Sequence, residues 1–525
     1  MTPRRNFPGI RGEHDGEAAL GSARHAVGGR PVAVGLRGPG GGGLRVEANG
    51  INMIVDAERR GRARELFWPW FGANVSVLGL SYGAFALGFG ISFWQAAITG
   101  LVGIVFSFLL CGFVALAGKR GSAPTMVLSR AAFGVRGNRL PAVISWLLTL
   151  GWETVLTITA TLATATVFER LGWGSGVQVQ VVALVVVAAL TVSAGVLGFD
   201  VIMRLQRLIT VVTAILTVIY IVLVLPQIDW STVAALPAGQ PAQVVGALVF
   251  FLTGFGLGWV NVAADYSRYL PRSASARGVV GWTTFGSSLA PIVLLVVGLL
   301  LAGSSPDLAA HIATDPVGAI AMTLPMWFLV PFAVVAVLGL VGGAVLDIYS
   351  SGLALLAAGL RVPRPAAAAI DGVLMVAGTV YVVFIAHHFL GEFTGFLITL
   401  GVPVAAWCGV ILADVLVRRS DYDNNDLYRP AGRYGDIRVG PIVLIVVATV
   451  LGWGLVTNAG AEWLQWQGYL LGPLGGRQGA WAGANLGVLV ALVMPFAVTL
   501  LADHARTEHA RRRVAEQPVP RFRQA

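Results

Sequence analysis

Long runs of apolar residues recur from residue 69 onward in this 525-residue sequence, and they restrict what the chain can fold into. The run from 278 to 303 contains no charged side chain at all. Runs of about 20 residues with almost no charge are typical of helices that span a membrane. Because a backbone surrounded by lipid must satisfy its own hydrogen bonds, the spanning elements are expected to be helices. The sequence therefore predicts an all-α polytopic membrane protein.

The apolar runs predict twelve transmembrane helices within one domain, residues 46–505. Their expected bounds are 69–93, 94–117, 140–166, 177–198, 205–226, 243–264, 279–303, 331–358, 367–386, 390–416, 440–457 and 481–502. Spans 1–5 thus cover about 69–226, spans 6–10 about 243–416, and spans 11–12 about 440–502. The proline-containing stretch 304–325 is expected to be a long loop with a short surface helix.

Basic residues concentrate in the loops on one side of these spans, which predicts the orientation of the chain. The loops on the other side carry only Arg170 and Arg477. The loop after span 2 alone carries Lys119, Arg120, Arg130, Arg136 and Arg139. Since short loops rich in lysine and arginine stay in the cytoplasm, we expect a plasma-membrane protein with both termini cytoplasmic. These loops and the tails account for the net charge of +10, so nucleic acid is not an expected partner.

The ends of the chain and its cysteines narrow the function classes. Residues 1–45 are rich in glycine, arginine and alanine and are expected to form a disordered cytoplasmic leader. Residues 506–525 are expected to form a basic cytoplasmic tail. Cys111 and Cys408 lie in separate apolar runs, which excludes a CxxC metal site. The sequence contains no metal-ligand cluster, nucleophile–base set or phosphate-binding loop, so we expect neither an enzyme nor a bound metal or cofactor.

Glycine interrupts two of the spans. One contains GLSYGAFALGFG (Gly79–Gly90), and the other contains GFGLG (Gly254–Gly258). Glycine is common in membrane helices, where it permits close packing, and packing alone would explain the glycines of either span taken by itself. If spans 1–5 and 6–10 are two halves, however, the first helix of each half is broken at a comparable place, and the odd number of spans inverts one half. Such corresponding broken helices indicate a transport site near the middle of the membrane.

The third span carries an acid on a polar stripe. Glu153 is followed by threonines at spacings of four, four and three residues, so all four side chains share one helix face. Ionisable residues inside a span are costly and are functional candidates by default. For Glu153, a structural pair with another helix stays open beside a substrate or proton role. Trp152, at the edge of the stripe, is favoured as a site residue, whereas Trp146 is better placed for the interfacial belt.

Spans six and eight supply the remaining candidates. Asp347 lies well within span eight, and no basic residue is near it in sequence, which favours a functional role. Trp259 and Asn261 come directly after the glycine break of span six. An indole face stacks on flat ring systems, and an amide offers both a donor and acceptors. Asp265, at the end of the same span, is expected to be architectural, through a local salt bridge.

Several stretches of the sequence, taken together, are specific for one protein family. They are ERRGRARELFWPWFGANVS before and into span one, GKRGSAPTMVLSRAAFGVRGNRLP after span two, GW at 151–152, WVNVAADYSRYLP ending span six, DIYSSGLAL in span eight and LADVLVRRSDYDNNDLY after span ten. In them, from about Ile51 to Arg438, the chain resembles the nucleobase–cation symporter-1 family, particularly its cytosine/purine permease branch.

The resemblance implies a leucine-transporter-like five-plus-five inverted repeat plus two extra helices, working by alternating access. It implies that a planar ring is held between a tryptophan of span three and one of span six, positions taken here by Trp152 and Trp259. Asp347 stands where relatives have a ring-binding asparagine. Ser81 corresponds to a polar residue near the break of span one.

The chain departs from the family pattern around this pocket. Leu156 stands where relatives often have Asn or Gln, so the polar contribution is expected from Glu153. Sodium-coupled members place hydroxyl side chains in span eight, roughly where Val341 and Gly342 stand here. Because Glu153 and Asp347 can both titrate, they are the proton-coupling candidates, and H⁺ is expected as the coupling ion rather than Na⁺.

The leading hypothesis is a secondary active symporter that imports a nucleobase, cytosine or a purine, with protons. Its predicted substrate site comprises Trp152, Glu153, Trp259, Asn261, Asp347 and Ser81. The alternatives are a symporter for another planar heterocycle, such as a hydantoin, allantoin or a vitamin precursor, and a membrane sensor that binds a ligand without moving it. The expected partners are a small-molecule nucleobase and the lipid bilayer, and the sequence leaves the oligomeric state open.

Overall fold

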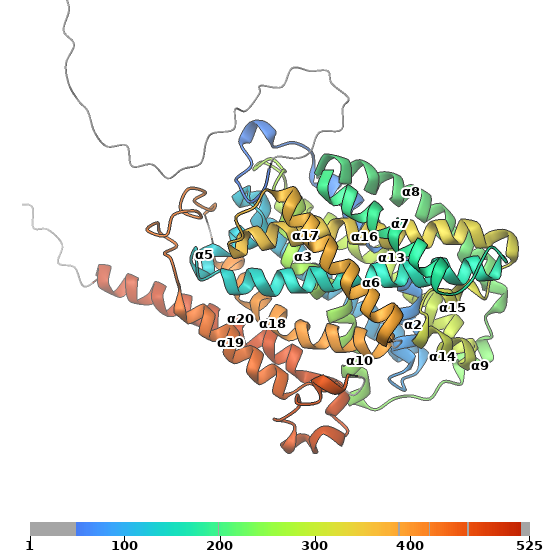
Figure 1. Cartoon of the computed structure of the whole chain (residues 1–525). Coiled ribbons are helices and arrows are strands. Elements are labelled where there is room, and N and C mark those ends of the chain that lie inside the picture. The colour runs from blue at the N-terminus through green and yellow to red at the C-terminus, as the bar shows by residue number, and fades with distance from the viewer. Residues whose placement is uncertain (1–48, 198, 387–388, 419, 459–460, 516–525) are drawn as a thin grey trace, which may run out of the picture. The chain divides into compact units, whose positions relative to one another are not determined.

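The computed structural model describes residues 49–515 apart from 198, 387–388, 419 and 459–460. Within these residues the regular structure is helical, with no strand (Figure 1). The predicted leader 1–45 lies outside the described residues, as do residues 516–525 of the predicted tail.

Most of the described chain lies in long helices. They are α3 (Phe93–Gly121), α6 (Arg139–Arg170), α7 (Val177–Leu197), α8 (Phe199–Val224), α13 (Ala276–Ser304), α16 (Leu329–Ala358), α17 (Arg364–Tyr381), α18 (Phe389–Val417), α19 (Val439–Gly454) and α20 (Leu486–Ala515). Two interrupted spans consist of α1 (Phe67–Asn74) with α2 (Leu78–Leu87), and of α10 (Pro241–Gly254) with α11 (Gly256–Trp259) and α12 (Ala263–Ser267). Short helices in the connections are α4 (Thr125–Leu128), α5 (Arg130–Phe133), α9 (Trp230–Ala234), α14 (Pro306–Thr314) and α15 (Gly318–Ala321). The last two lie in the stretch 304–325, where a short helix was predicted.

The number of spans is close to the prediction but does not equal it. Among the described residues, ten helices are long and apolar enough to cross a membrane, and the bent pair at the start raises this to eleven. The apolar helix α19 is shorter, with 16 residues. The prediction of an all-helical polytopic membrane protein is therefore confirmed, whereas the count of twelve spans is not.

The connection between the last two helices is longer than predicted. α19 ends at Gly454 rather than at 457, and α20 begins at Leu486 rather than at 481. Asn485, directly before α20, has a left-handed backbone with φ of 51°. Its Oδ1 accepts a hydrogen bond from the Thr457 N–H at 2.9 Å. This bond ties the two ends of the connection together.

The first span bends by 65° between α1 and α2. The break lies at residues 75–77, before the glycine-rich stretch 79–90 that was expected to contain it, so that expectation is wrong. The Asn74 side chain donates back to the Trp70 carbonyl at 2.8 Å, and the Ser76 hydroxyl accepts from the Leu78 N–H at 3.3 Å. Short polar side chains at 74 and 76 thus compete with the helical hydrogen bonds and end the first segment.

The glycines of α2 serve helix packing instead. A Cβ at Gly83 would lie 2.2 Å from the backbone carbon of Gly298 on α13. A Cβ at Gly298 would lie 1.9 Å from the Leu80 carbonyl oxygen on α2. Because both obstacles are backbone atoms, only glycine permits this close approach of the two helices.

The segment 49–62, here called the N-terminal segment, is fastened to three connections of the bundle. Its bonds are Arg59 Nε to the Leu270 carbonyl (2.8 Å), Ile54 N–H to the Ser122 carbonyl (2.8 Å) and Tyr428 Oη to the Ile51 carbonyl (2.5 Å). These partners follow α12, α3 and α18 in the chain. The segment therefore bridges the ends of spans that are far apart in sequence.

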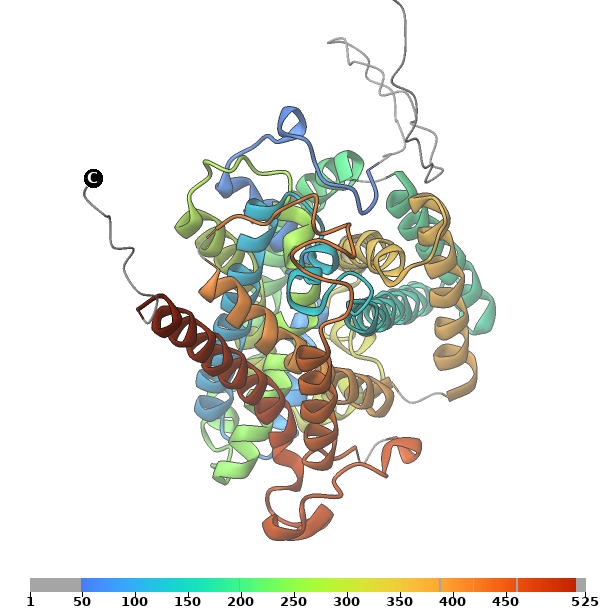
Figure 2. The same cartoon turned by 90° about the vertical axis from the view of Figure 1, so that its left-hand side faces the viewer.

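The helices that carry the predicted site residues pack on one another. α6 lies along α16, and α17 packs on both of them (Figure 1). α18, α19 and α20 form a neighbouring group (Figure 2). In contrast, α7 and α8 expose valines such as Val182, Val185 and Val218, each about 60% exposed, as suits a surface that faces lipid.

Candidate substrate site

Span six is interrupted at Phe255, within the glycine-rich stretch predicted to break it. α10 ends at Gly254, Phe255 has φ of −117° and ψ of −107°, and α11 begins at Gly256. The Gly258 N–H donates to the Phe255 carbonyl at 2.9 Å, which is the tighter i+3 pattern. The predicted break is therefore confirmed, and it places Trp259 at the end of a single helical turn.

Side chains of neighbouring helices satisfy the backbone groups that the break sets free. The Tyr82 hydroxyl donates to the Gly254 carbonyl at 3.1 Å. The Gly256 N–H donates to the Ser107 hydroxyl at 2.9 Å, and the Cys111 thiol donates to the Gly256 carbonyl at 3.0 Å. Since a buried backbone group without a partner costs about 1–3 kcal/mol, these contacts from α2 and α3 stabilise the interrupted geometry.

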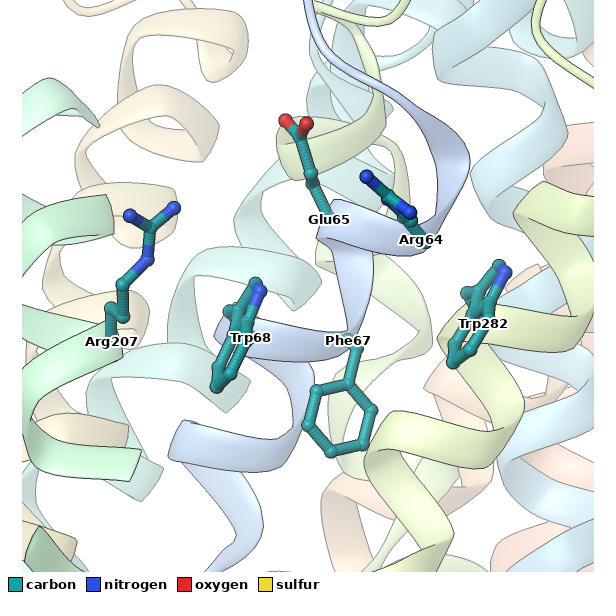
Figure 3. A pocket seen from close by; sticks show the side chains of 6 residues that line it. All are labelled: Arg64, Glu65, Phe67, Trp68, Arg207 and Trp282. Atoms are coloured by element: carbon teal, nitrogen blue, oxygen red, sulfur yellow. The ribbon is translucent and has the colours of Figure 1, made fainter. Parts of the chain in front are cut away.

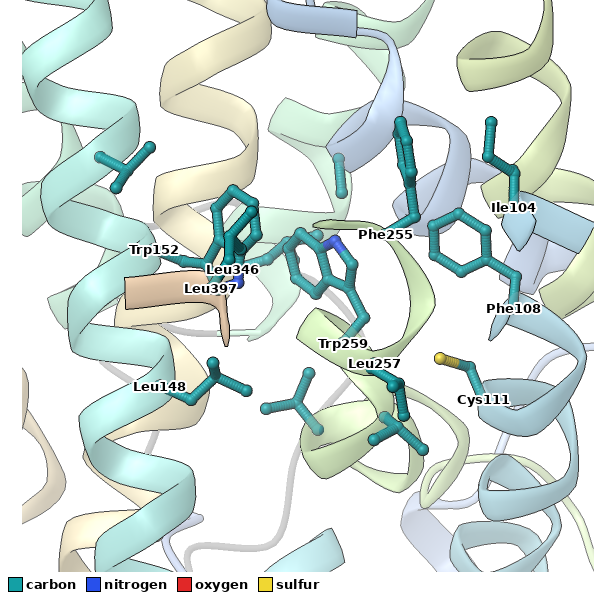
Figure 4. Packing of buried hydrophobic residues seen from close by; sticks show 14 of the residues in the cluster. Ile104, Phe108, Cys111, Leu148, Trp152, Phe255, Leu257, Trp259, Leu346 and Leu397 are labelled. Carbon is teal, nitrogen blue, oxygen red and sulfur yellow. The ribbon is translucent and has the colours of Figure 1, made fainter. Parts of the chain in front are cut away.

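Trp152 and Trp259 meet beside this break. Figure 4 shows both indoles pointing toward one another, Trp152 from α6 and Trp259 from α11. A Cβ at Gly258 would lie 2.8 Å from Trp152 Nε1, so this indole rests against the backbone of the break. Edge-to-face contacts fix both rings, Trp152 on Phe393 with centroids 5.8 Å apart and Trp259 on Trp70 at 5.9 Å. The structure thus brings together the two tryptophans predicted to hold a planar ring.

Glu153 and Asp347 are buried acids without partners. Glu153 on α6 is 0% exposed, and Asp347 on α16 is 1% exposed. Neither carboxyl has a hydrogen-bond partner among the described residues, and no ion pair there includes them. They lie close enough for their charges to interact. Because buried polar groups are almost always paired, two unpaired buried carboxyls are unusual, and their place in the substrate site stays a prediction.

Asn261 and Ser81 differ in which hydrogen-bonding atoms of their side chains remain without a partner. Asn261 Nδ2 donates to the Ser145 hydroxyl at 2.8 Å, two turns before Trp152 on α6, while its Oδ1 is buried without a partner. The Ser81 hydroxyl donates to the Pro316 carbonyl at 2.6 Å, in the turn before α15. Asn261 therefore retains an unused acceptor, whereas the donor of Ser81 is already occupied. The place of both in the substrate site stays a prediction.

A hydrogen-bonded group of three residues was not singled out from the sequence. Trp146 Nε1 donates to Asp371 Oδ1 at 2.6 Å, and the Ser351 hydroxyl donates to Asp371 Oδ2 at 2.9 Å. Asp371 is 0% exposed, and its charge acts on Glu153. The indole of Trp146 is half-buried and its N–H serves a buried carboxylate, while its place in the interfacial belt stays a prediction. The available signal was that Asp371 interrupts the apolar run of span nine as Asp347 interrupts that of span eight.

Asp265, expected to be architectural, is hydrogen-bonded to a residue of another connection. Its Oδ1 accepts from the Thr125 N–H at 2.7 Å and from the Thr125 hydroxyl at 2.8 Å. Thr125 begins α4, and its hydroxyl oxygen accepts from the Ala264 N–H at 3.0 Å. Hydrogen bonds to the connection after α3 therefore hold the end of span six, and Arg268 is near enough for its charge to act on Asp265.

A separate cavity lies at the start of α1 (Figure 3). Its volume is about 530 Å³, and it is lined by Arg64, Glu65, Phe67, Trp68, Arg207 and Trp282. The Arg207 guanidinium lies over the Trp68 ring, 6.0 Å from its centroid. Tryptophan with arginine at the end of a span is typical of the membrane interface. None of these residues belongs to the predicted substrate site.

Span eight crosses the break of span one through glycines. A Cβ at Gly339 would lie 2.9 Å from the Val75 carbonyl oxygen. Gln206 Nε2 of α8 donates to the Gly342 carbonyl at 2.5 Å. Beside Val341 and Gly342, this part of α16 therefore presents backbone carbonyls, one of them already bonded to an amide, and no hydroxyl side chain.

These features define a class: a helical membrane transporter with a bent first span, an interrupted sixth span, and buried unpaired acids on spans three and eight. The chain belongs to the family of permeases for cytosine and purines, uracil, thiamine and allantoin, whose sequence profile matches residues 53–439. It is therefore a multi-pass membrane permease of the nucleobase type, as the resemblance predicted.

The relatives in sequence have low identity to this chain, and the matched region differs in length between them. YxlA of Bacillus subtilis (strain 168), described as a purine-cytosine permease, is 24% identical over 464 residues, which cover 86% of this chain and 94% of YxlA. The vitamin B6 transporter TPN1 of Saccharomyces cerevisiae is 24% identical over 271 residues, which cover 49% of this chain and 45% of TPN1.

The fold is that of a solved transporter of the nucleobase–cation-symport-1 family. Mhp1, in a closed conformation with bromovinylhydantoin bound, superposes with a TM-score of 0.66 over 89% of this chain and 97% of Mhp1. The sequence identity is 18%, so this likeness concerns the fold. The predicted leucine-transporter-like architecture is thereby confirmed.

Proposed function

We propose that the protein imports a nucleobase, cytosine or a purine, in symport with protons across the plasma membrane. The family to which the chain belongs and the permease YxlA support a nucleobase as substrate. TPN1 is a vitamin B6 transporter and Mhp1 binds a hydantoin, so another planar heterocycle is the alternative substrate. The transport needs no chemical conversion of the substrate, and the proposal accordingly includes no enzymatic step.

One observation carries this proposal: buried groups around the interrupted span have polar atoms without partners. They are Trp152 Nε1, both oxygens of Glu153, Asn261 Oδ1 and both oxygens of Asp347. A nucleobase has N–H donors and nitrogen or carbonyl acceptors along its edge and two apolar faces. Its donors suit the carboxyl and amide oxygens. Its faces suit stacking on Trp152 and Trp259.

Proton coupling is supported by the side chains available near the proposed site, which suit a proton better than a sodium ion. Glu153 and Asp347 are buried carboxyls that can each take up a proton. A sodium ion needs several oxygen ligands, and span eight presents Val341 and Gly342 in place of hydroxyl side chains. The hydrogen bond from Gln206 to the Gly342 carbonyl further reduces the oxygen available there.

Uptake into proteoliposomes tests the proposal. We expect radiolabelled cytosine or adenine to accumulate when the outside is acid relative to the lumen, and not when only a sodium gradient is imposed. Glu153→Gln keeps the size of the side chain but cannot release a proton, so it should abolish accumulation. The matched control is Glu169→Gln, the same change at an exposed position near the other end of α6, which should accumulate substrate as the wild type does.

Each alternative gives a different result. Accumulation of a hydantoin, allantoin or pyridoxine in place of nucleobases would assign the alternative substrate. Substrate binding without counterflow would indicate a sensor. Accumulation driven by sodium alone would overturn proton coupling, and no gradient-driven uptake of any planar heterocycle would overturn transport.

The proposed orientation, with both termini in the cytoplasm, is supported by the basic loops on one side of the spans. Cys111 and Cys408 are buried, so a single cysteine introduced at exposed Asn52 is a selective label. In intact cells, an impermeant thiol reagent should leave this cysteine unmodified. Modification from outside would reverse the proposed orientation.

A further inference from the structure

Asp371 is joined to the proposed substrate site through one hydroxyl group. Asp371 on α17 and Ser351 on α16 are both 0% exposed. The Ser351 hydroxyl donates to Asp371 Oδ2 at 2.9 Å and also lies beside the carboxyl of Glu153. The Glu153 carboxyl has no hydrogen-bond partner of its own among the described residues. The Ser351 hydroxyl on α16 therefore lies between two carboxyls, bonded to that of Asp371 on α17 and next to that of Glu153 on α6.

We propose that Asp371 is the acceptor of the coupled proton from Glu153, with Ser351 as the relay between them. In the transfer, the O–H bond of the Glu153 acid breaks and a new O–H bond forms at Ser351 Oγ. The original Ser351 O–H bond breaks as its proton binds Asp371 Oδ2. Glu153 ends as a carboxylate, Asp371 as a carboxylic acid and Ser351 as an unchanged hydroxyl, so charge and protons balance.

The hydrogen bonds already have the direction that this step needs. The Ser351 hydroxyl has one proton, and the Asp371 oxygen at 2.9 Å is a nearer acceptor than the Ile348 carbonyl at 3.3 Å. The lone pairs of Ser351 Oγ therefore remain available to a proton from Glu153. On the far side, the bond from Trp146 Nε1 at 2.6 Å holds Asp371 Oδ1, which keeps Oδ2 toward Ser351.

The relay also leads toward one membrane surface. Glu153 is the fifteenth residue of α6, which begins at Arg139, and Asp371 is the eighth residue of α17, which begins at Arg364. At about 1.5 Å per residue, Glu153 lies about 20 Å from the start of its helix and Asp371 about 10 Å from the start of its own. Both helices begin on the side proposed to be cytoplasmic. A proton passed to Asp371 has therefore moved inward.

Asp371 has no neutralising cation among the described residues. Glu153 of α6 is near enough for its charge and that of Asp371 to interact, and Asp347 of α16 is likewise near Glu153. α7, which also packs on α17, contains no titratable side chain. Arg364, on α17 itself, donates instead to two backbone carbonyls near the end of α7, at 2.8 and 2.7 Å. A carboxylate without a fixed cation can gain and lose a proton during the cycle, whereas a salt-bridged one is held in its charged form.

The test separates proton transfer from substrate exchange in proteoliposomes. We expect Asp371→Asn and Ser351→Ala to retain cytosine counterflow at equal pH but to lose pH-driven accumulation and the substrate-dependent proton influx reported by a dye in the lumen. Ser351→Thr keeps the hydroxyl and should restore both. Ser287→Ala removes a buried hydroxyl that bonds the Thr283 carbonyl of its own helix, so it is the matched control for Ser351→Ala and should still accumulate substrate.

The inference rests on the proposed function, and the outcomes distinguish the two. If the wild type and Glu169→Gln accumulate substrate, Glu153→Gln does not, and Asp371→Asn does, the relay is overturned and the proposed function stands. If the wild type shows no proton-driven accumulation, the proposed coupling fails and the relay with it. If Asp371→Asn does not fold, the Ser351→Ala and Ser351→Thr pair decides: equal accumulation by both overturns the relay.

Discussion

The indole nitrogen of Trp152 lies against the backbone of Gly258, where a Cβ would come within 2.8 Å of it. Trp152 belongs to α6, and Gly258 belongs to α11, the single turn that follows the break of span six. The Trp152 ring can therefore occupy this position in the proposed pocket only because residue 258, on the opposite side, is a glycine without a side chain.

The first prediction concerns this contact. Gly258→Ala should displace the Trp152 ring, because the new methyl group has no other space. Overpacking of this kind costs about 1–3 kcal/mol, and about 1.4 kcal/mol of that cost in the substrate-bound state would raise the KM of nucleobase uptake about tenfold. Gly440→Ala on α19 is the control, since a Cβ there meets nothing within 4 Å. An unchanged KM in Gly258→Ala would show that the position of the indole does not affect binding.

The second prediction concerns the packing of α2 on α13. Gly298→Ala should lower the melting temperature of the purified protein and its yield in membranes, because the Leu80 carbonyl that obstructs the methyl group is backbone and cannot rotate away. We expect a loss of about 3 kcal/mol, the upper end of the cost of overpacking. Gly281→Ala on the same helix, where a Cβ meets nothing within 4 Å, should melt as the wild type does. Equal melting of the two variants would contradict the proposed role of the glycine contact.

The third prediction concerns the interruption of span six. Ser107→Ala removes the acceptor of the Gly256 N–H and leaves that group buried without a partner. This should lower the free energy of unfolding by about 1–3 kcal/mol, measurable by thermal unfolding in detergent. Ser287→Ala is a matched control, because that buried hydroxyl bonds only the carbonyl of Thr283 in its own helix. If both variants lose the same stability, the Ser107 hydroxyl does not support the break.

The fourth prediction concerns an ion pair outside the spans. Arg136 Nε donates to both carboxylate oxygens of Asp436, at 2.8 and 2.7 Å. This hydrogen bonding holds the pKa of Asp436 below its ordinary value. The unfolded value is about 3.9, so the ionised carboxylate stabilises the fold above about pH 4, and that contribution is lost as the pH falls through the lower folded-state pKa.

Asp436→Asn should therefore flatten the decline of the melting temperature between about pH 5 and pH 3. Arg136→Gln should flatten it as well, because it removes the group that lowers the pKa of Asp436. A decline as steep in both variants as in the wild type would show that another group controls acid stability in this range.

The helical membrane fold could be predicted because hydropathy alone fixes which segments leave water. The break of span six was also predictable, since Gly254–Gly258 places several glycines beside the actual interruption at Phe255. The break of span one was misplaced because a glycine that permits packing has the same sequence appearance as one that permits a turn. What distinguishes Gly83 is its partner Gly298, which lies on another helix far along the chain.

The candidate site was likewise predictable only where a residue stands out in its own segment, and not where its role depends on contacts with other helices. Glu153 and Asp347 were found because an acid within an apolar run is conspicuous, and the tryptophan pair was found through the family resemblance. Asp371 sits in an apolar run too, but its importance depends on Ser351 and Trp146 from two other helices. For the same reason, the sequence could not show that the Trp146 N–H donates to a buried carboxylate.

The N-terminal segment has a practical consequence. It is bonded to the connections after α3, α12 and α18 at once, so any rearrangement that separates these connections must break its bonds or carry it along. Asn52 on this segment and Ser273 after α12 are both exposed and accept a probe without disturbing the interior. With a pair of spin labels at these positions, double electron–electron resonance measures the distance between them. A change in that distance would report when this end of the bundle opens.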